Sequence, residues 1–230
     1  MKEMLYIVST PIGNLKDITF RAIETLRSVD LIAAEDTRHT KILLDAYQIR
    51  RPLTSFFEHN QLKKTEGLLE LLKAGKSVAL VTDAGTPGIS DPGFLLVRRA
   101  MENNVPVSVI PGASACLTAL TASGLPAHRF LFEGFLPIKS GARRHKLESL
   151  KGFKGTLIFY ESPHRLLKTL KDMQDVWEDP VIVVARELTK KFEEVLRDKT
   201  SRLMEHFRLH APKGEFVLLR NEDEDGSLHT

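Results

Sequence analysis

The chain has 230 residues, a formal net charge of +3, and hydrophobic and charged fractions of 42% and 27%, which are ordinary values for a globular protein. The small net charge gives no overall basic signal for nucleic acid, so any such signal must be local. The single cysteine, Cys116, excludes an internal disulfide framework and a multi-cysteine zinc site. No apolar run has the length of a signal peptide or a membrane span, so we expect a cytoplasmic protein without a membrane partner.

The first half of the chain alternates short apolar runs with amphipathic stretches. Strands are predicted at Met4–Ser9, Leu31–Ala34, Leu53–Phe57, Val78–Val81 and Val107–Ile110. Helices are predicted at Ile18–Val29, Thr40–Tyr47, Gln61–Lys73 and Phe94–Met101. Each helix is long enough for a parallel crossover, so the pattern predicts an α/β fold with a mostly parallel sheet covered on both faces. The polar loops follow the strands and should line one edge of this sheet.

The second half has more strands and fewer crossovers, so we expect a mixed sheet there. The predicted strands are Phe130–Phe135, Gly155–Tyr160, Val181–Ala185, Phe192–Leu196 and Gly214–Leu219. One helix should begin with Ser162 as N-cap and Pro163 as first helical residue and run to about Val176, and another should span Leu203–Leu209. We expect a first domain at residues 1–118, a second at 119–220 and an acidic, disordered tail at 221–230.

The stretch Val81–Gly93 is the most unusual connection in the first half. It joins a buried strand to a helix, and it is longer than a simple connection, with three glycines, two prolines and two aspartates. Glycine lets backbone N–H groups approach a ligand closely, and proline stiffens the loop. An ordinary turn is the alternative. Because ligands of α/β sheets collect at the carboxyl ends of strands, we interpret the loop as the floor of a small-molecule site.

A second unusual stretch, Leu136–Lys154, is strongly basic. It holds six lysines and arginines against one acidic residue, Glu148, for a local net charge of about +5. A solvated helix face is the alternative to a nucleic-acid contact, and the charge favours contact with phosphates. The predicted RNA-binding residues are Lys139, Arg143, Arg144 and Lys146. The histidines show no metal-binding spacing, so we predict no metal.

Six short motifs follow one another along nearly the whole chain. They are S-T-P-I-G-N-L at Ser9–Leu15, A-E-D-T-R at Ala34–Arg38, T-D-A-G-T-P-G-I-S-D-P-G at Thr82–Gly93, P-G-A-S-A at Pro111–Ala115, Y-E-S-P-H-R at Tyr160–Arg165 and R-E-L-T-K at Arg186–Lys190. Together they resemble the ribosomal RNA small subunit methyltransferase I family, which belongs to the tetrapyrrole methylase superfamily.

The resemblance implies two α/β domains with S-adenosylmethionine folded into the cleft between them. It implies 2′-O-methylation of a cytidine in the decoding region of 16S ribosomal RNA, usually by a homodimer. It also implies that cofactor contacts come from residues of both domains. They are Pro11, Asp83, Ala84, Gly85, Thr86, Ile89, Ser114 and Ala115 from the first half, and Glu161 and Leu188 from the second. Asp83 could accept a ribose hydroxyl or cap its turn.

The acceptor in such a reaction is a ribose hydroxyl, which is a poor nucleophile until its proton is removed. Lys190 at the end of R-E-L-T-K could stabilise the developing alkoxide, and Asp36 or Glu161 could take the proton or orient the ribose. A surface ion pair of Lys190 with Glu187 or Glu193 is the alternative.

Two other functions fit the same fold. One is methylation of a tetrapyrrole or another small substrate, and the other is RNA binding without catalysis. The basic stretch and the R-E-L-T-K motif favour RNA, and the intact D-A-G-T-P-G loop favours a working cofactor site.

Overall fold

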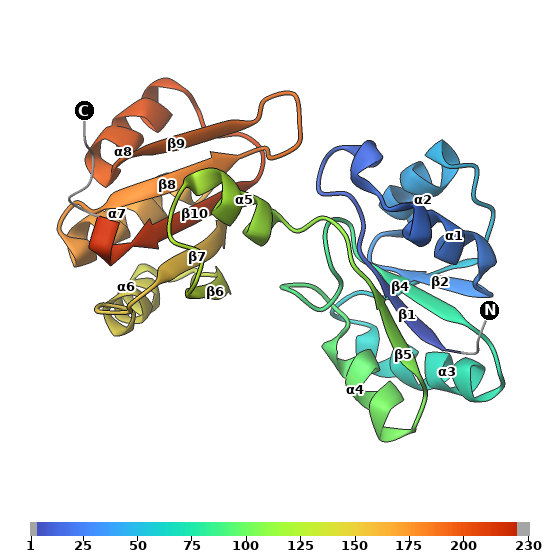
Figure 1. Cartoon of the computed structure of the whole chain (residues 1–230). Coiled ribbons are helices and arrows are strands. Elements are labelled where there is room, and N and C mark those ends of the chain that lie inside the picture. The colour runs from blue at the N-terminus through green and yellow to red at the C-terminus, as the bar shows by residue number, and fades with distance from the viewer. Residues whose placement is uncertain (1–3, 225–230) are drawn as a thin grey trace. The chain divides into compact units, whose positions relative to one another are not determined.

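The computed structural model describes residues 4–224 and divides after Ser114 into two compact units (Figure 1). Each unit contains a five-stranded sheet with helices packed on it. Within the described residues, no helix combines the length and the apolar character needed to cross a bilayer.

The first unit is an all-parallel sheet in the order β3-β2-β4-β1-β5. Its strands are β1 (Leu5–Val8), β2 (Leu31–Ala34), β3 (Leu53–Ser55), β4 (Val78–Val81) and β5 (Val107–Ile110). Its helices are η1 (Leu15–Asp17), α1 (Phe20–Ser28), α2 (Thr37–Ala46), α3 (Gln61–Lys73) and α4 (Phe94–Glu102). The predicted α/β fold with a mostly parallel first sheet is confirmed.

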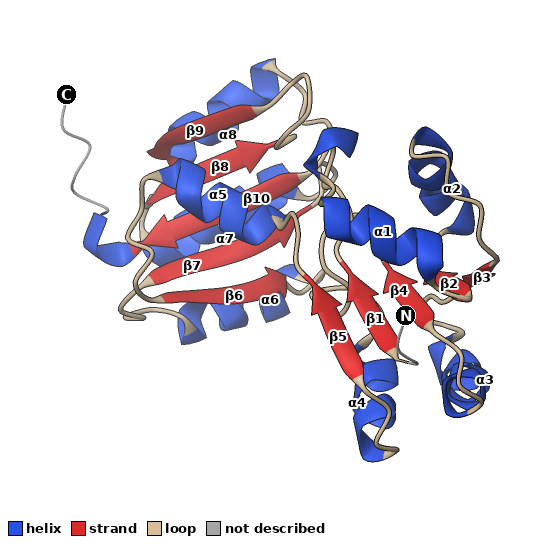
Figure 2. Ribbon diagram, turned by 45° about the vertical axis from the view of Figure 1, so that its right-hand side comes forward, coloured by secondary structure: helices blue, strands red, loops and turns tan. Residues whose placement is uncertain are grey.

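Side-chain alternation along the strands divides the core of this unit into two layers. In β1, Tyr6 and Val8 pack on the face covered by α1 and α2, whereas Leu5 and Ile7 pack on the face covered by α3 and α4. Figure 2 shows the helices on both faces of this sheet. Both faces are buried, which is why the strands read as continuous apolar runs in the sequence.

The second unit is a mixed sheet in the order β6-β7-β10-β8-β9, as predicted. Only β6 and β7 are parallel neighbours, and the other pairs are antiparallel. The strands are β6 (Phe130–Phe135), β7 (Thr156–Glu161), β8 (Val181–Arg186), β9 (Glu194–Lys199) and β10 (Phe216–Asn221), the last of which runs into η2 (Glu222–Glu224). The helices are α5 (Ala115–Ser123), α6 (Ser140–Ser149), α7 (Leu166–Trp177) and α8 (Thr200–Leu209).

The main core of the second unit lies between the sheet and helices α6, α7 and α8. Large side chains such as Phe159 on β7, Leu170 on α7 and Phe207 on α8 are completely or almost completely buried in it. Helix α5 lies on the other face, where it contacts β7, β8 and β10 (Figure 2).

Three predictions about this half of the chain are corrected by the structure. A boundary after residue 118 would cut α5, which packs as a whole on the second sheet. Helix α7 begins at Leu166 instead of Pro163, because residues 162–165 form a turn in which Arg165 N–H donates to the Ser162 carbonyl. In the tail, Asn221 completes β10 and residues 222–224 form η2; residues 225–230 lie outside the described residues.

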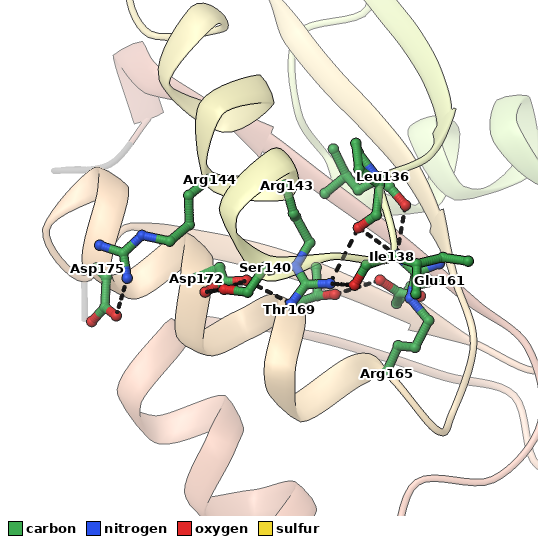
Figure 3. Close-up of polar contacts among 11 residues, drawn as sticks. Leu136, Ile138, Ser140, Arg143, Arg144, Glu161, Arg165, Thr169, Asp172 and Asp175 are labelled. Atoms are coloured by element: carbon green, nitrogen blue, oxygen red, sulfur yellow. Dashed lines mark hydrogen bonds and ion pairs between the residues drawn. The ribbon is translucent and has the colours of Figure 1, made fainter.

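A buried ion pair joins α6 to α7 in this unit (Figure 3). Both Arg143 and Asp172 are almost fully buried, and the guanidinium donates to Asp172 Oδ2 through Nε at 2.7 Å, with Nη2 at 2.6 Å. Ser140 Oγ donates to Oδ1 of the same carboxylate at 2.9 Å, and Arg143 Nη1 donates to the carbonyls of Pro137 and Ile138. The pair therefore fixes the start of α6 and the loop before it.

Asp172→Ala should lower the free energy of unfolding by about 3–5 kcal/mol, because it leaves a buried guanidinium without its counter-charge. The measurement is urea unfolding at neutral pH. Asp175→Ala is the matched control: it removes surface pairs with Arg144 and Lys171 one turn away and should cost less than about 1 kcal/mol. Equal losses in the two variants would contradict a structural role for the buried pair.

Candidate functional site

The loops that follow β1 and β4 are joined directly to each other. Thr10 and Gly85 exchange both backbone hydrogen bonds, at 2.9 and 3.1 Å, and form an isolated antiparallel bridge. The hydroxyls of Ser9 and Thr86 share a hydrogen bond of 2.8 Å, and Thr10 Oγ1 donates to the Thr82 carbonyl at 3.0 Å. Because the carboxyl ends of parallel strands lie at one edge of the sheet, these contacts hold the Val81–Gly93 loop at the position where ligands of such sheets bind.

Two glycines are required by this arrangement. Gly85 has φ +85°, a left-handed conformation that residues with a side chain rarely adopt. A Cβ added there would lie 3.7 Å from Ile12 and 3.9 Å from the Ala113 carbonyl. At Gly112, after β5, an added Cβ would lie 2.9 Å from Ser9 Cβ. The loops after β1, β4 and β5 therefore meet around Gly85 with backbone close to backbone.

The predicted cofactor residues of the first unit come from these same three loops. Pro11 and Gly85 are buried beside the bridge, and Ala84, Thr86 and Ser114 are partly exposed. Ile89 lies farther along the loop, where its N–H donates to the Thr86 carbonyl and its side chain is 47% exposed. Their contact with a cofactor stays a prediction, as does the expected cleft.

A chain of carboxylates ties the end of β2 to the end of β4. Glu35 Oε2 accepts from Thr82 Oγ1 at 2.5 Å and from Asp83 N–H at 3.3 Å. Asp83 Oδ1 in turn accepts from Asp36 N–H at 3.1 Å. Burial and the nearby Glu35 raise the pKa of Asp83, although the Asp36 N–H and His39 oppose the shift. Asp83 therefore already holds the β2 loop, and one of its oxygens is engaged.

A cavity of about 490 Å³ lies beside the Val81–Gly93 loop, within the first unit. Its lining includes Glu35, Glu58, Gln61, Asp91 and Phe94. Burial, followed by the charge of Glu35, raises the pKa of Asp91 to about 6, and a hydrogen bond from Thr82 opposes this only in part. The sequence alone suggests a turn cap for Asp91. The structure shows a half-buried carboxyl near those of Glu35 and Asp83, which come from earlier in the chain.

Asp36 is a poor proton acceptor in this structure. It caps α2, accepting from Arg38 N–H at 2.8 Å, and it also pairs with the Arg38 guanidinium at 2.7 Å. The hydrogen bond from the Arg38 side chain is the largest of the effects that lower the pKa of Asp36 to about 2. Asp36 can orient a hydroxyl as a hydrogen-bond acceptor, but the predicted role as a general base is not favoured.

The predicted residues of the second unit also share one edge of a sheet. Phe216 at the start of β10 pairs with both Glu161 at the end of β7 and Arg186 at the end of β8. The loops that begin after Glu161 and after Arg186 therefore leave the sheet at the same edge. This edge carries Leu188 and Lys190, whereas Ala115 lies at the start of α5.

Glu161 is a structural residue of this edge. Its side chain is fully buried, and it accepts from Ser162 N–H at 2.8 Å. It also accepts from Thr169 Oγ1 at 2.5 Å and lies 3.3 Å from the Arg165 guanidinium (Figure 3). These contacts hold the turn before α7, so the prediction that the Glu161 side chain acts as a base or touches the cofactor is not favoured. Leu188 is also buried, and its contact with a cofactor stays a prediction.

Lys190 forms a surface ion-pair cluster, as the alternative interpretation proposed. Its Nζ lies 2.9 Å from Glu187 Oε1 and 3.1 Å from Glu215 Oε2. Burial lowers the pKa of Lys190, but the hydrogen bonds that it donates to Glu187 and Glu215 outweigh this effect, so the net shift of the pKa is upward. Lys190 therefore stays protonated at neutral pH. It can donate to a developing oxyanion, and it cannot serve as a base.

The basic stretch is largely neutralised by its own neighbours. Arg143 is buried against Asp172, which removes it from the predicted RNA-contacting set. Arg144 pairs with Asp175, and Lys146 pairs with Glu133. The net charge of about +5 counted for Leu136–Lys154 does not include these acidic partners, because they lie on β6 and α7, outside that stretch. Lys139 makes no ion pair with any of the described residues.

The profile of the tetrapyrrole (corrin/porphyrin) methylases matches residues 4–203. A Haemophilus influenzae protein named ribosomal RNA small subunit methyltransferase I is 54% identical over 94% of this chain and 77% of its own length. A Thermotoga maritima protein of the same name is 49% identical over 94% of this chain and 96% of its own length. The chain belongs to the ribosomal RNA small subunit methyltransferase I family. The resemblance drawn from the six motifs is therefore confirmed.

Solved structures support the fold of this methyltransferase I family member at lower identity. A diphthine synthase aligns with a TM-score of 0.73 at 15% identity, covering 94% of this chain and 88% of that one. The uroporphyrin-III C-methyltransferase of Thermus thermophilus, in complex with S-adenyl homocysteine, aligns with a TM-score of 0.66 at 20% identity, covering 95% and 97%. The two-unit α/β architecture is therefore that of the tetrapyrrole methylases.

Gly85→Ala should strain the bridge to Thr10 by about 1–2 kcal/mol, because alanine disfavours the left-handed conformation. Calorimetric affinity for S-adenosylmethionine should then fall by roughly tenfold, with a lower melting temperature. Gly67→Ala on exposed α3 is the control: a Cβ there meets open space, and the variant should be as stable as the parent or up to about 1 kcal/mol more stable. Unchanged affinity in Gly85→Ala would reject the placement of the cofactor.

Asp91→Asn should stabilise this methyltransferase at neutral pH and not at pH 4. Because the folded pKa of about 6 exceeds the ordinary value of 3.8, the carboxyl contributes stability that is present below pH 4 and lost as the pH rises through 6. The difference in melting temperature between Asp91→Asn and the parent should therefore grow from pH 4 to pH 6.5 and then level off. Parallel curves would contradict a half-buried Asp91 with a raised pKa. Asp45→Asn, at an exposed position, controls for the change of charge.

Proposed function

We propose that the chain transfers the methyl group of S-adenosylmethionine to the 2′-hydroxyl of a cytidine in the decoding region of 16S ribosomal RNA. Its membership of the ribosomal RNA small subunit methyltransferase I family is the observation that carries the proposal. The chain is a methyltransferase of the S-adenosylmethionine-dependent tetrapyrrole methylase class. The particular nucleotide and the 2′-oxygen come from the resemblance of the six motifs.

The loops around Gly85 fit the cofactor. They offer closely spaced backbone donors and acceptors at the carboxyl edge of a parallel sheet, fixed by the Thr10–Gly85 bridge and by the Ser9 and Thr86 hydroxyls. S-adenosylmethionine supplies a methyl group on a positively charged sulfur, so the protein need only hold it in line with the attacking oxygen. Such positioning accounts for several kcal/mol of barrier lowering.

Lys190 is the residue best suited to assist the chemistry from the second unit. Its Nζ carries a charge throughout the neutral range and is held by Glu187 and Glu215, so it can donate a hydrogen bond to the 2′-oxygen as negative charge develops there. Asp36, kept ionised by Arg38, can accept a hydrogen bond from a ribose hydroxyl and orient it. As the bond between the 2′-oxygen and the methyl carbon forms, the bond between that carbon and sulfur breaks and S-adenosylhomocysteine leaves. The hydroxyl proton passes to solvent water.

The direct test uses small ribosomal subunits from a strain in which this methyltransferase gene is deleted. The purified protein should add one methyl group per subunit from labelled S-adenosylmethionine, and nuclease mapping with mass spectrometry should place it on the ribose of a decoding-region cytidine. Label on a base, or at a site outside the decoding region, would contradict the 2′-O proposal. Transfer to a uroporphyrin-type tetrapyrrole in place of RNA would support the alternative function.

Lys190→Met should lower the single-turnover rate of methylation on the order of 100-fold at saturating cofactor and RNA, because it removes one donor to the developing oxyanion. Both affinities and the melting temperature should be preserved. Lys191→Met, which removes the neighbouring exposed lysine, is the matched control. A rate near that of the parent would show that Lys190 has only a structural role in its surface cluster.

A further inference from the structure

A groove of about 440 Å³ opens between helices α6, α7 and α8 of the second unit, on the face of the sheet that these helices cover. We call it the α7–α8 groove. Its lining is Ser140, Arg143, Leu167, Lys168, Lys171, Asp172 and Arg208. Four of these side chains are cationic and one is acidic, so the groove carries excess positive charge in a concave surface.

Some cations of the groove lack a carboxylate partner within residues 4–224, whereas most cations of the basic stretch Leu136–Lys154 have one. Arg143 and Asp172 neutralise each other below the surface. Lys171 lies 2.7 Å from Asp175, but that carboxylate is shared with Arg144, so two cations depend on one anion. Among the described residues, Lys168 and Arg208 form no ion pair or side-chain hydrogen bond, and both are exposed.

The groove is also firmly built. Lys168 and Lys171 lie one turn apart on α7, and the same helix is fixed to α6 by the buried Arg143–Asp172 pair and by the Ser140 hydroxyl (Figure 3). Arg208 lies in the last turn of α8, which contacts α7 and places Phe207 in the same buried core. The free cations therefore stand on helices that are anchored in the main core.

We propose that the α7–α8 groove binds phosphates of the ribosomal RNA backbone, with Lys168 and Arg208 as the principal contacts. The inference rests on the proposed function for its ligand. Phosphodiesters suit the groove because they carry one negative charge each at regular spacing, and unpaired lysine and arginine side chains bind them without first breaking an ion pair. The exposed face of α6, by contrast, offers mainly cations that are already paired.

The test compares two double charge reversals in the full chain. Lys168→Glu with Arg208→Glu alters the groove, and Lys199→Glu with Arg202→Glu makes the same charge change at exposed positions outside its lining. Binding to unmodified small ribosomal subunits is measured from 50 to 250 mM KCl. The groove variant should lose affinity and show a slope of log affinity against log salt that is smaller by roughly 2, one for each lost phosphate contact. The control should keep most of the slope, and both should bind S-adenosylmethionine as the parent does.

The outcomes separate the two proposals. If both variants lose the same affinity for subunits, the groove proposal is wrong. It is also wrong if the groove variant loses no affinity. In either case the proposed function stands as long as the parent methylates subunits. A parent protein that neither binds nor methylates small subunits would overturn both. Subunit binding is also compared in potassium phosphate and in KCl at equal ionic strength. If the two salts weaken binding equally, the groove contacts the polymer backbone. If phosphate weakens binding more than chloride does, the groove is a small-anion site instead.

Discussion

The bridge between Thr10 and Gly85 is the contact on which the candidate site depends. It is a single antiparallel pair between loops that leave parallel strands, and it holds only because Gly85 adopts a left-handed conformation. The hydroxyls of Ser9, Thr10 and Thr82 extend the same contact from β1 to β4, and Glu35 extends it to β2. The sheet thus supplies rigid strand ends, and short polar side chains convert them into one continuous surface.

Charge pairing organises the second unit in a comparable way. The buried Arg143–Asp172 pair joins α6 to α7, and carboxylates nearer the surface form ion pairs with Arg144 and Lys146 of α6. Positive charges that lie close together in the sequence are therefore largely neutralised by acidic side chains from other elements. Within the part of the chain that the structure describes, Lys168 on α7 and Arg208 on α8 stay unpaired, as does Lys139 before α6. An electrostatic footprint for RNA therefore has to be counted from unpaired side chains rather than from local composition.

Much of the fold was readable from the sequence, and the reasons are local. Strands such as Leu31–Ala34 and Phe130–Phe135 were predicted to the residue, because apolar runs end at polar or glycine residues. The burial of Arg143 and the raised pKa of Asp91 were not readable, because both depend on residues far away along the chain. The start of α7 was missed for a local reason: the Glu161 carboxylate accepts from Ser162 N–H, and the helix begins after Arg165 without a side-chain cap.

The central claim is that the loops around the Thr10–Gly85 bridge hold the cofactor, and amide hydrogen exchange tests it most directly. Saturating S-adenosylmethionine should slow exchange in peptides covering Ser9–Leu15 and Thr82–Ile89, because ligand binding shields these backbone groups and suppresses local opening. Peptides from α3, on the body of the first unit, should be unaffected. Unchanged exchange in both loops, at a cofactor concentration that calorimetry shows to be saturating, would contradict the account.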